Sequence, residues 1–336
     1  MKGDEKILLS HGSGGKLTHD LIRKFFLQRF LNPILLELTD SALVDGAPKL
    51  AFTTDSYVVK PLFFPGGDIG KLAVAGTVND LAVMGAEPKY ISCGFIIEEG
   101  HDMEPLCRIV DSMRRTAEAA GVLIVTGDTK VVGKDEADQL FINTSGIGFV
   151  DEGVRLSVNR VRVGDRIILS GSVGDHGIAV LSQRGGFEFE VNVKSDCAPL
   201  NGLISKVLAA SDKVKFMRDP TRGGLATALN EIVGGREFGI LIEEEKIPVK
   251  EGVRAVCELL GLDPLYLANE GKVVVVVASE DADQVLEAMR QDRLGKDAEI
   301  IGTVVEEPKG MVCLKTVISG TRIVDMLVAD QLPRIC

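Results

Sequence analysis

The feature that most constrains the fold is an alternation of strand-like and helix-like segments that runs twice along the 336-residue chain. Helix-length segments with apolar spacing of 3.6 are predicted at 17–30, 69–84, 104–120, 176–185, 200–210, 221–234, 250–260 and 281–291. Strand-length apolar runs are predicted at 50–55, 90–97, 122–129, 166–171, 239–243, 272–278 and 298–305, with 140–150 closing the first half. This pattern predicts an α+β fold that is built in two halves.

The division into domains follows from the length and from one polar stretch. About 150 residues per domain predicts two domains for this chain. The polar and basic residues 151–164 interrupt the alternation and are expected to link the halves. We therefore expect an N-terminal Gly-rich segment and helix at 1–39, a first domain at 40–152, a second α+β domain at 153–330, and a tail at 331–336.

Composition excludes several classes of function. The net charge of −11 argues against nonspecific binding to nucleic acid or to an anionic membrane, which depends on clustered positive charge. No apolar run approaches the roughly 20 residues that span a bilayer, and the first residues lack the apolar stretch of a signal peptide. A cytoplasmic protein is expected. The six cysteines show no metal-ligand spacing, so five are expected to be small buried residues, whereas Cys336 ends the chain.

Two glycine-rich segments invite comparison with phosphate loops. Residues 10–16 (SHGSGGK) do not fit the Walker A spacing, and no strand precedes them. They could still present backbone amides and Lys16 to phosphates, or they could be a polar tail. Residues 174–177 (GDHG) follow a strand and open a helix, so they could bind an anion or simply form a tight turn.

Carboxylates beside Gly, Thr and Asn give the strongest chemical signal. They occur at strand ends or in turns, at Asp40, Asp55, Asp80, Asp128 and Asp219. Mg²⁺ prefers hard oxygen ligands and is often shared with substrate phosphates, although a single Asp in such a setting is more often a cap or turn residue. Glu270 precedes a five-valine run, where it could be a general base with a raised pKa or a solvated turn residue.

Taken together, ten segments resemble the ATP-binding superfamily of aminoimidazole ribonucleotide synthetase, selenophosphate synthetase and thiamine-phosphate kinase. They cover nearly the whole chain in order and are 11–16, 52–56, 63–67, 76–80, 92–95, 125–132, 174–177, 218–224, 268–272 and 333–336. The ending Pro-Arg-Ile-Cys (333–336) is specific to one branch, the carbamoyl dehydratases of hydrogenase maturation. The other members lack a reactive C-terminal cysteine.

The resemblance implies a two-domain fold in which the N-terminal sheets pair in a homodimer. ATP and Mg²⁺ would lie in a cleft between the N-terminal domains, which makes 40–152 the ATP-binding domain. The implied metal ligands are Asp55, Asp80 and Asp128. The implied cofactor-binding residues are Gly12, Gly14, Gly15, Lys16, Asp40, Thr54, Asn79, Thr129 and Asp219, of which Asp40 departs from the wider double-Asp pattern.

The resemblance also implies a reaction on the tail. A partner carbamoyltransferase would modify Cys336 to an S-carboxamide, which this protein would dehydrate with ATP to a thiocyanate. The cyanide would then pass to the iron of a nascent [NiFe] site on a maturation scaffold complex. Phosphorylation makes the amide oxygen a good leaving group, and Lys130 and Glu270 are the candidate proton acceptors, with their division of labour left open.

The tail itself is compatible with such a role. Residues 331–336 reach at most about 20 Å when fully extended, which suits movement between an exposed and a buried position. Two other functions remain open at this stage. One is a superfamily enzyme that phosphorylates or activates a free small-molecule amide or phosphate, and the other is a non-enzymatic adaptor that docks a partner through its tail.

Overall fold

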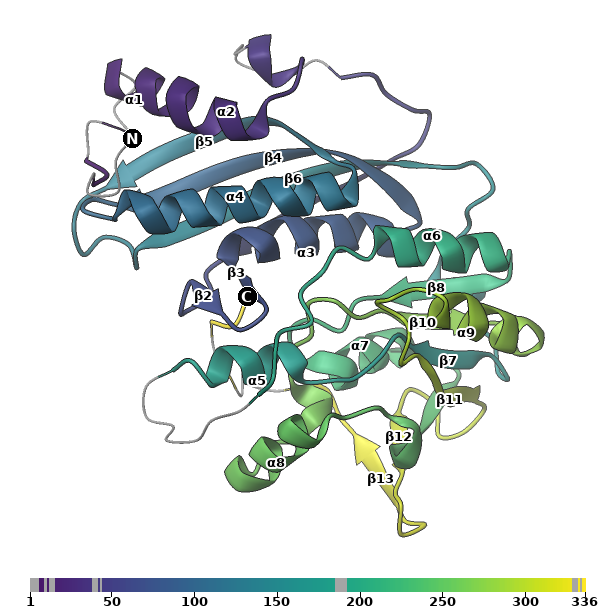
Figure 1. Ribbon diagram of the computed structural model, residues 1–336. Coiled ribbons are helices and arrows are strands. Elements are labelled where there is room, and N and C mark those ends of the chain that lie inside the picture. The colour runs from purple at the N-terminus through teal and green to yellow at the C-terminus, as the bar shows by residue number, and fades with distance from the viewer. Residues whose placement is uncertain are drawn as a thin grey trace.

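Two packed halves form the molecule, and the C-terminus lies between them (Figure 1). The computed structural model describes residues 6–8, 11, 16–37, 42, 44–184, 192–327, 332 and 334–336. No helix among these residues is long and apolar enough to cross a membrane.

The N-terminal half contains a four-stranded sheet in the order β1-β6-β4-β5. Its strands are β1 (Leu50–Tyr57), β4 (Ala86–Glu98), β5 (Leu123–Val132) and β6 (Leu140–Val150), with a small hairpin of β2 (Phe63–Phe64) and β3 (Gly67–Asp68). Its helices are α1 (Lys16–Leu21), a π-helical turn (Ile22–Phe26), α2 (Leu27–Phe30), α3 (Ile69–Val83) and α4 (Met103–Ala120).

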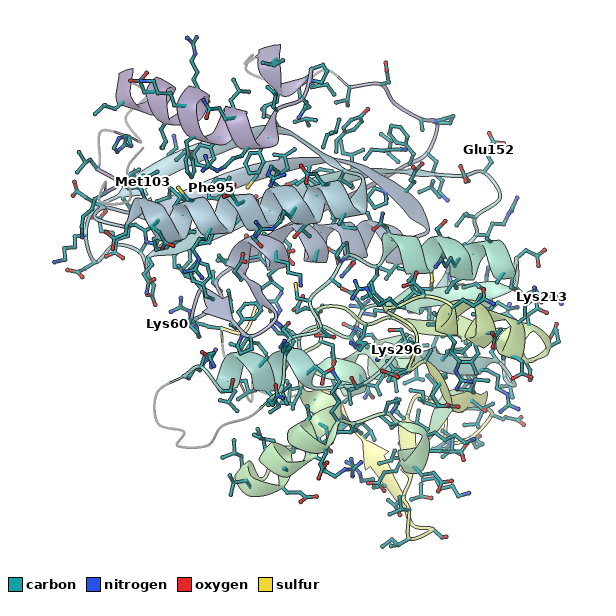
Figure 2. All side chains as sticks on the ribbon, viewed as in Figure 1. Lys60, Phe95, Met103, Glu152, Lys213 and Lys296 are labelled. Carbon is teal, nitrogen blue, oxygen red and sulfur yellow. The ribbon has the colours of Figure 1, made fainter. Side chains whose placement is uncertain are left out.

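Helices cover only one face of this sheet. Alternate residues of β4, including Ile91, Cys93 and Phe95, are buried against α4 and the N-terminal helices. In Figure 2, Phe95 lies beneath α2, and its ring is 5.0 Å from that of Phe26. The opposite face carries exposed side chains, and Phe52 and Ile96 are 71% and 43% exposed. This face of the described chain is therefore uncovered.

The C-terminal half is a seven-stranded sheet in the order β13-β12-β9-β11-β7-β10-β8. Its strands are β7 (Arg166–Leu169), β8 (Val214–Arg218), β9 (Gly239–Glu243), β10 (Val274–Val277), β11 (Glu299–Val305), β12 (Val312–Lys315) and β13 (Thr321–Val324). Its helices are α5 (Asp175–Leu181), α6 (Asn201–Ala210), α7 (Gly224–Val233), α8 (Glu251–Leu260) and α9 (Ala282–Arg290).

Strand β10 shows why this sheet is buried on both faces. Val274 and Val276 belong to the core beneath α7, whereas Val275 and Val277 belong to the core beneath α6 and α9. A strand covered on both faces has a continuous apolar run, as this one does, rather than an alternating one. Helix α3 packs against α6, so the core under α6 continues into the N-terminal half through Ala82 and Val83.

The expected α+β fold is confirmed, and the predicted helices and strands occur with bounds shifted by a few residues. The prediction missed β8, β12, β13 and the β2–β3 hairpin. Four cysteines are buried as expected, but Cys107 is only partly buried on the side of α4. Its position between covered and exposed helix faces explains that error.

Candidate functional site

Four acidic side chains from different elements converge between the two halves. Asp55 lies on β1 and Asp80 on α3, and the Thr53 hydroxyl donates a 2.8 Å hydrogen bond to Asp80. Asp219 follows β8, and Glu270 precedes β10 in the adjacent turn. Elements of both halves therefore supply one acidic cluster, which contains Asp55, Asp80 and Asp219 of the predicted series but not Asp128.

Glu270 is buried, whereas Asp55, Asp80 and Asp219 are half-buried. Burial, with the charges of Asp80 and Asp55 as further causes, raises the pKa of Asp219 to about 7. Burial and then Asp219 raise the pKa of Glu270 well above its usual range. Burial also raises the pKa of Asp80, although the Thr53 hydrogen bond opposes this. The cluster thus holds more negative charge than its surroundings compensate.

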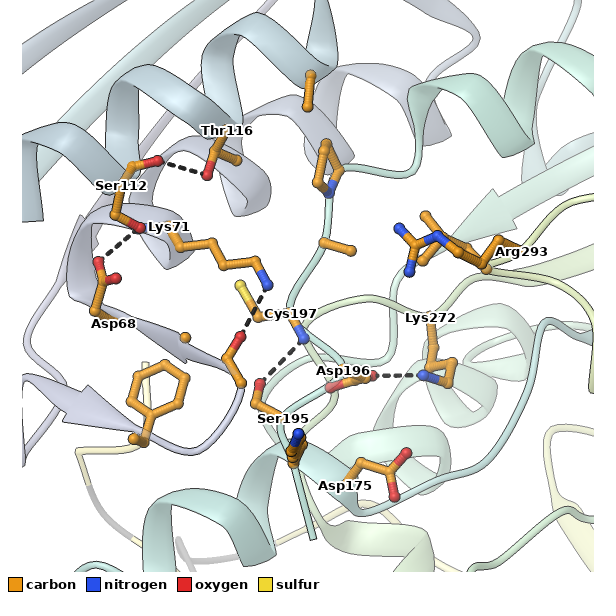
Figure 3. A pocket seen from close by; sticks show the side chains of 18 of the residues that line it. Asp68, Lys71, Ser112, Thr116, Asp175, Ser195, Asp196, Cys197, Lys272 and Arg293 are labelled. Carbon is orange, nitrogen blue, oxygen red and sulfur yellow. Dashed lines mark hydrogen bonds and ion pairs between the residues drawn. The ribbon is translucent and has the colours of Figure 1, made fainter. Parts of the chain in front are cut away.

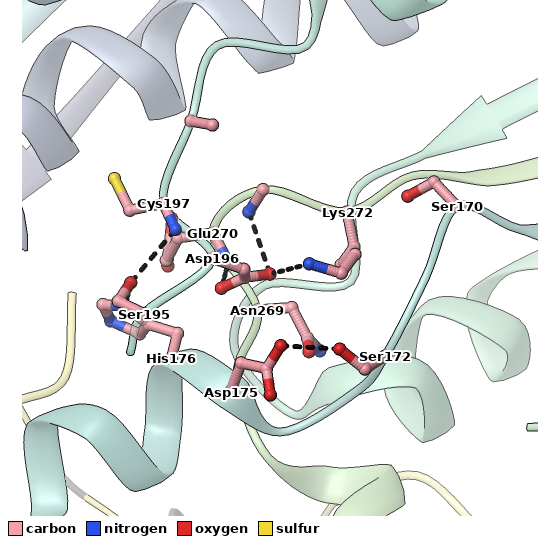
Figure 4. Close-up of polar contacts among 12 residues, drawn as sticks. Ser170, Ser172, Asp175, His176, Ser195, Asp196, Cys197, Asn269, Glu270 and Lys272 are labelled. Atoms are coloured by element: carbon pink, nitrogen blue, oxygen red, sulfur yellow. Dashed lines mark hydrogen bonds and ion pairs between the residues drawn. The ribbon is translucent and has the colours of Figure 1, made fainter. Parts of the chain in front are cut away.

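Glu270 is held in place through its backbone. Asp196, which is almost fully buried, accepts hydrogen bonds from the amides of Glu270 and Gly271 and forms a 3.0 Å ion pair with Lys272 (Figure 4). The buried Oε1 of Glu270 has no hydrogen-bond partner among the described residues. The Glu270 carboxylate is therefore positioned by its turn while one oxygen stays available.

Two asparagine side chains beside the cluster, Asn79 and Asn269, hydrogen-bond to the surrounding backbone. Asn79 on α3 bonds to the carbonyls of Ala198 and Glu270 and accepts from the amide of Leu200, which engages its amide group fully. Asn269 accepts from the amide of Gly174 at the start of α5, at 2.8 Å. The amide of Gly177 also donates to the carbonyl of Ala268, so two amides of residues 174–177 are engaged within the fold.

The end of the chain is docked against the segment after β1. The amide of Val58 donates to the main-chain oxygen of Cys336, and the amide of Lys60 donates to the carbonyl of Arg334. The Arg334 guanidinium donates back to the carbonyl of Val58 and pairs with Asp138 at 2.6 Å. Figure 2 shows Lys60 beside this tail. Main-chain pairing thus fixes the tail in register.

His176 holds the tail from the other side. Its Nε2 lies 2.6 Å from the carbonyl oxygen of Ile335, and its Nδ1 lies 2.8 Å from the hydroxyl of Ser195. A carbonyl only accepts, so Nε2 donates, and Nδ1 accepts from Ser195. Burial lowers the pKa of His176, which favours this neutral form.

Cys336 reaches the neighbourhood of the acidic cluster. It lines a cavity of about 260 Å³ together with Val58, Arg222 and Ala268. The positive charge of Arg222 also acts on Glu270. A cation between the terminal thiol and the acidic cluster offsets the negative charge of the chain's own carboxylate terminus.

Asp128 and Lys130 lie elsewhere in the chain. Both are exposed on β5 and form a 3.7 Å ion pair with each other. Strand β5 is at the opposite edge of the sheet from β1, three strand spacings or about 14 Å away. Thr54 lies on the uncovered face, and Thr129 follows Asp128. A single chain therefore brings Asp55 and Asp80 together without Asp128 or Lys130.

Several predicted positions cannot be placed. Gly12, Gly14, Gly15 and Asp40 lie outside the described residues. Lys16 is described only through its backbone, at the start of α1. The proposed strap over the phosphates therefore stays a prediction.

The sequence argument missed the roles of three residues. Arg222 stands inside the quoted segment 218–224, and His176 inside 174–177, so both carried a signal that was read only as part of a motif. The sequence carried no signal for Asp138, because this residue lies in a polar loop and pairs with Arg334 only in the folded chain.

Both halves of the chain match known domain families. Residues 38–150 match the AIR synthase related protein, N-terminal domain, and residues 162–315 match its C-terminal domain. The chain is 51% identical to the carbamoyl dehydratase HypE of Rhodobacter capsulatus over 99% of both chains. A crystal structure of hydrogenase maturation protein HypE in complex with ATP superimposes with a TM-score of 0.94 at 50% identity, covering 98% of this chain and 99% of that one. The HypE chain of a HypE–HypF complex gives 0.80 at 50% identity, covering 91% and 99%.

The raised pKa of Asp219 predicts a specific pH dependence of stability. A carboxyl group with a folded pKa above its unfolded value stabilises the fold at low pH, and this contribution is lost as pH rises toward about 7. We expect the free energy of unfolding to fall by about 2 kcal/mol from this group between pH 5 and 7. In Asp219→Asn the fall should be smaller, and stability at pH 8 higher, in urea titrations. Asp212→Asn, at an exposed position nearby, should behave as the wild type; equal slopes in all three proteins would contradict the assignment.

The His176 contact predicts a measurable change in tail docking. His176→Phe keeps a ring against Phe64 but removes the donor to Ile335, which is worth about 1 kcal/mol. Alkylation of Cys336 by iodoacetamide, located by peptide mass spectrometry, should accelerate about fivefold to tenfold, while alkylation of Cys107 stays constant. His101→Phe is the matched control, because His101, in the turn after β4, forms no hydrogen bond with the tail in the described chain. An unchanged Cys336 rate in His176→Phe would show that the tail docks without this bond.

Proposed function

The chain belongs to the AIR synthase related family and, within it, to the HypE carbamoyl dehydratases of hydrogenase maturation, and from this we propose how its own residues carry out the reaction. It is an ATP-dependent carbamoyl dehydratase. We propose Cys336 as the carrier, whose S-carboxamide is converted to a thiocyanate that supplies cyanide to the iron of a [NiFe] hydrogenase. The observation that carries this proposal is the docked tail, which brings Cys336 beside Arg222 and next to the turn of Glu270.

The reaction divides into two proton losses. The amide oxygen attacks the γ-phosphoryl group of ATP, ADP leaves, and the nitrogen gives up its first proton. The resulting O-phosphoryl imidate loses its second N–H proton as the C–O bond breaks, which yields the C≡N bond and phosphate. We assign Glu270 as the proton acceptor, because burial makes its carboxylate a stronger base and its Oε1 has no other partner among the described residues.

The acidic cluster fits a divalent cation. Asp55, Asp80 and Asp219 offer the hard oxygen atoms that Mg²⁺ prefers, and a cation between them would offset the mutual repulsion that contributes to the raised pKa values of Asp80 and Asp219. Within the described chain, no group of three His, Cys, Asp or Glu side chains could hold a metal alone. Nucleotide phosphates would therefore complete the coordination, and Mg²⁺ would neutralise the transferring phosphoryl group.

A second copy of the chain is needed to complete the site. Asp128 and Lys130 project from the uncovered sheet face at the β5 edge, whereas Asp55 and Asp80 lie at the β1 edge. Pairing of two sheets about a twofold axis would bring β5 of one chain to β1 of the other and cover Phe52 and Ile96. We propose such a homodimer, in which Lys130 serves the tail of its partner.

The remaining assignments follow the same proposal. The domain at 40–152 binds ATP. The N-terminal segment that contains Gly12, Gly14, Gly15 and Lys16 covers the phosphates of the nucleotide. Three further residues contact the nucleotide, namely Asp40, Thr54 and Thr129. Asn79 departs from the role predicted for it as a cofactor-binding residue, because its amide group contacts Ala198, Leu200 and Glu270 and thereby positions Glu270. A carbamoyltransferase of the HypF kind modifies Cys336, since a HypE–HypF complex is known, and an iron-carrying scaffold complex accepts cyanide. We propose that these steps occur in the cytoplasm.

Mass spectrometry of the tail tests the reaction. On carbamoylated protein, ATP should convert the Cys336 carboxamide to a species lighter by one water, with release of ADP and phosphate. Cys336→Ala should give no such product while ATP binding persists, and Glu270→Gln should slow it by about a hundredfold or more. Cys107→Ala is the matched control. ATP turnover on a soluble metabolite by a chain truncated before residue 333 would instead favour a small-molecule enzyme.

Subunit mixing tests the dimer. Lys130→Ala and Cys336→Ala chains should each be inactive alone, since one lacks the Lys and the other the carrier. If Lys130 acts across the interface, a mixture that has exchanged subunits should recover about a quarter of the wild-type rate, because half of the dimers hold one complete site. A mixture that stays inactive after exchange has been verified would place Lys130 in the same chain as its tail.

A further inference from the structure

A second and larger cavity lies between the two halves, apart from the tail. Its volume is about 860 Å³, and one wall is formed by the β2–β3 hairpin, α3 and α4 of the N-terminal half. The other wall is formed by residues 170–175, 194–199 and 293–297 (Figure 3). Nothing in the dehydration of Cys336 uses this space.

Basic side chains line both walls of this cavity. The whole chain has 38 Lys and Arg against 49 Asp and Glu, whereas the cavity lining contains more basic than acidic residues. From the N-terminal half come Lys71, Arg108 and Arg115, and from the C-terminal half Lys194, Lys250, Lys272, Arg293 and Lys296. In Figure 3, Lys71 and Arg293 reach into the space from opposite sides.

The acidic lining residues are largely engaged. Asp196 is paired with Lys272, and Asp175 accepts from Ser172 and Lys250, both at 2.6 Å. Asp68 accepts from the amides of Gly70 and Lys71 as the N-cap of α3. The two remaining acidic lining residues are paired as well, Asp111 with Arg29 at 3.0 Å and Asp297 with Lys296 at 4.0 Å. By contrast, Arg115 and Arg293 form no ion pair with any described residue. Uncompensated positive charge thus remains on both walls.

Like charges that face each other across a gap repel, and an anion between them removes that cost. Arginine and lysine together bind phosphate oxygens through charge-assisted hydrogen bonds. The volume falls within the range of small-molecule sites. The ring of Phe63 is already covered by Arg108 at 4.2 Å, which disfavours the stacking of a nucleobase there.

We propose that this interdomain cavity is a binding site for a small anion that carries at least two phosphate groups. One phosphate binds the α3–α4 wall through Lys71 and Arg115, and the other binds the opposite wall through Arg293 and Lys296. The bound anion would join the two halves of the chain.

This site is separate from the tail site, although the two share a wall. The segment Ser195–Cys197 lines the cavity, and on its other side Ser195 bonds to His176, which holds the tail. Cys336 and Arg222 line the smaller cavity and not this one. Binding at the two sites can therefore be measured independently.

Calorimetric titration with inorganic pyrophosphate tests the proposal. The full-length protein is first saturated with Mg²⁺ and a nonhydrolysable ATP analogue, so that the nucleotide site is filled. We expect one pyrophosphate to bind per chain, and the affinity to fall about tenfold or more in the double variant Arg115→Glu/Arg293→Glu. Both side chains are exposed, so the fold should tolerate the change. Lys296→Glu, on the same wall, should weaken binding as well and serves as an independent variant.

Arg254→Glu is the matched control, since Arg254 is exposed on α8 outside the cavity. It should bind pyrophosphate as the wild type does. No binding to the analogue-saturated wild type, or equal affinity in the double variant and the control, would overturn the proposal. Dehydration of carbamoylated Cys336 without pyrophosphate is measured on the same samples. Loss of that reaction in the wild type would count against the proposed function and not against this site.

Discussion

The buried ion pair of Asp196 and Lys272 is the contact on which the interdomain region depends. Asp196 also receives the amides of Glu270 and Gly271, so its charge is matched by three donors. Removal of one partner from such a pair leaves an uncompensated buried charge, which costs far more than the pair itself contributes. The segment that carries Asp196 therefore cannot shift without moving Glu270.

The same segment connects to both halves. Ser195 donates its amide to the carbonyl of Pro65 in the β2–β3 hairpin and bonds to His176 through its hydroxyl. A few residues later, Asn79 of α3 holds Ala198 and Leu200. One short stretch of backbone therefore contacts the turn of Glu270, the residue that holds the tail, and the hairpin. Function at the domain boundary requires this kind of rigidity, because reacting groups must be held within a fraction of an ångström.

Local patterns predicted much of this molecule. Helix α4 could be located because apolar spacing and a closing Gly121 in left-handed conformation both mark it. Asp55, Asp80 and Asp219 could be named as candidates because each lies in a segment rich in Gly, Thr or Asn, but their convergence with Glu270 depends on the packing of the two halves. Strands β12 and β13 could not, because they are short and β12 pairs in parallel with the distant β9. Asp138 pairs with Arg334 only because the whole fold brings them together. Lys130 is separated from Asp55 by the order of the strands, which no local sequence pattern encodes.

The docked tail changes what limits this enzyme. In the proposed reaction the group that is dehydrated belongs to the polypeptide itself, so its concentration cannot be raised to saturation as that of ATP can. Occupancy is instead an intramolecular equilibrium between a bound and a released tail, and its position is set by a few bonds, those of Val58, Lys60 and His176. If these bonds were much stronger, the thiol would remain sequestered from the proteins that load and unload it. Moderate docking is therefore the condition under which one cysteine can both react and be delivered.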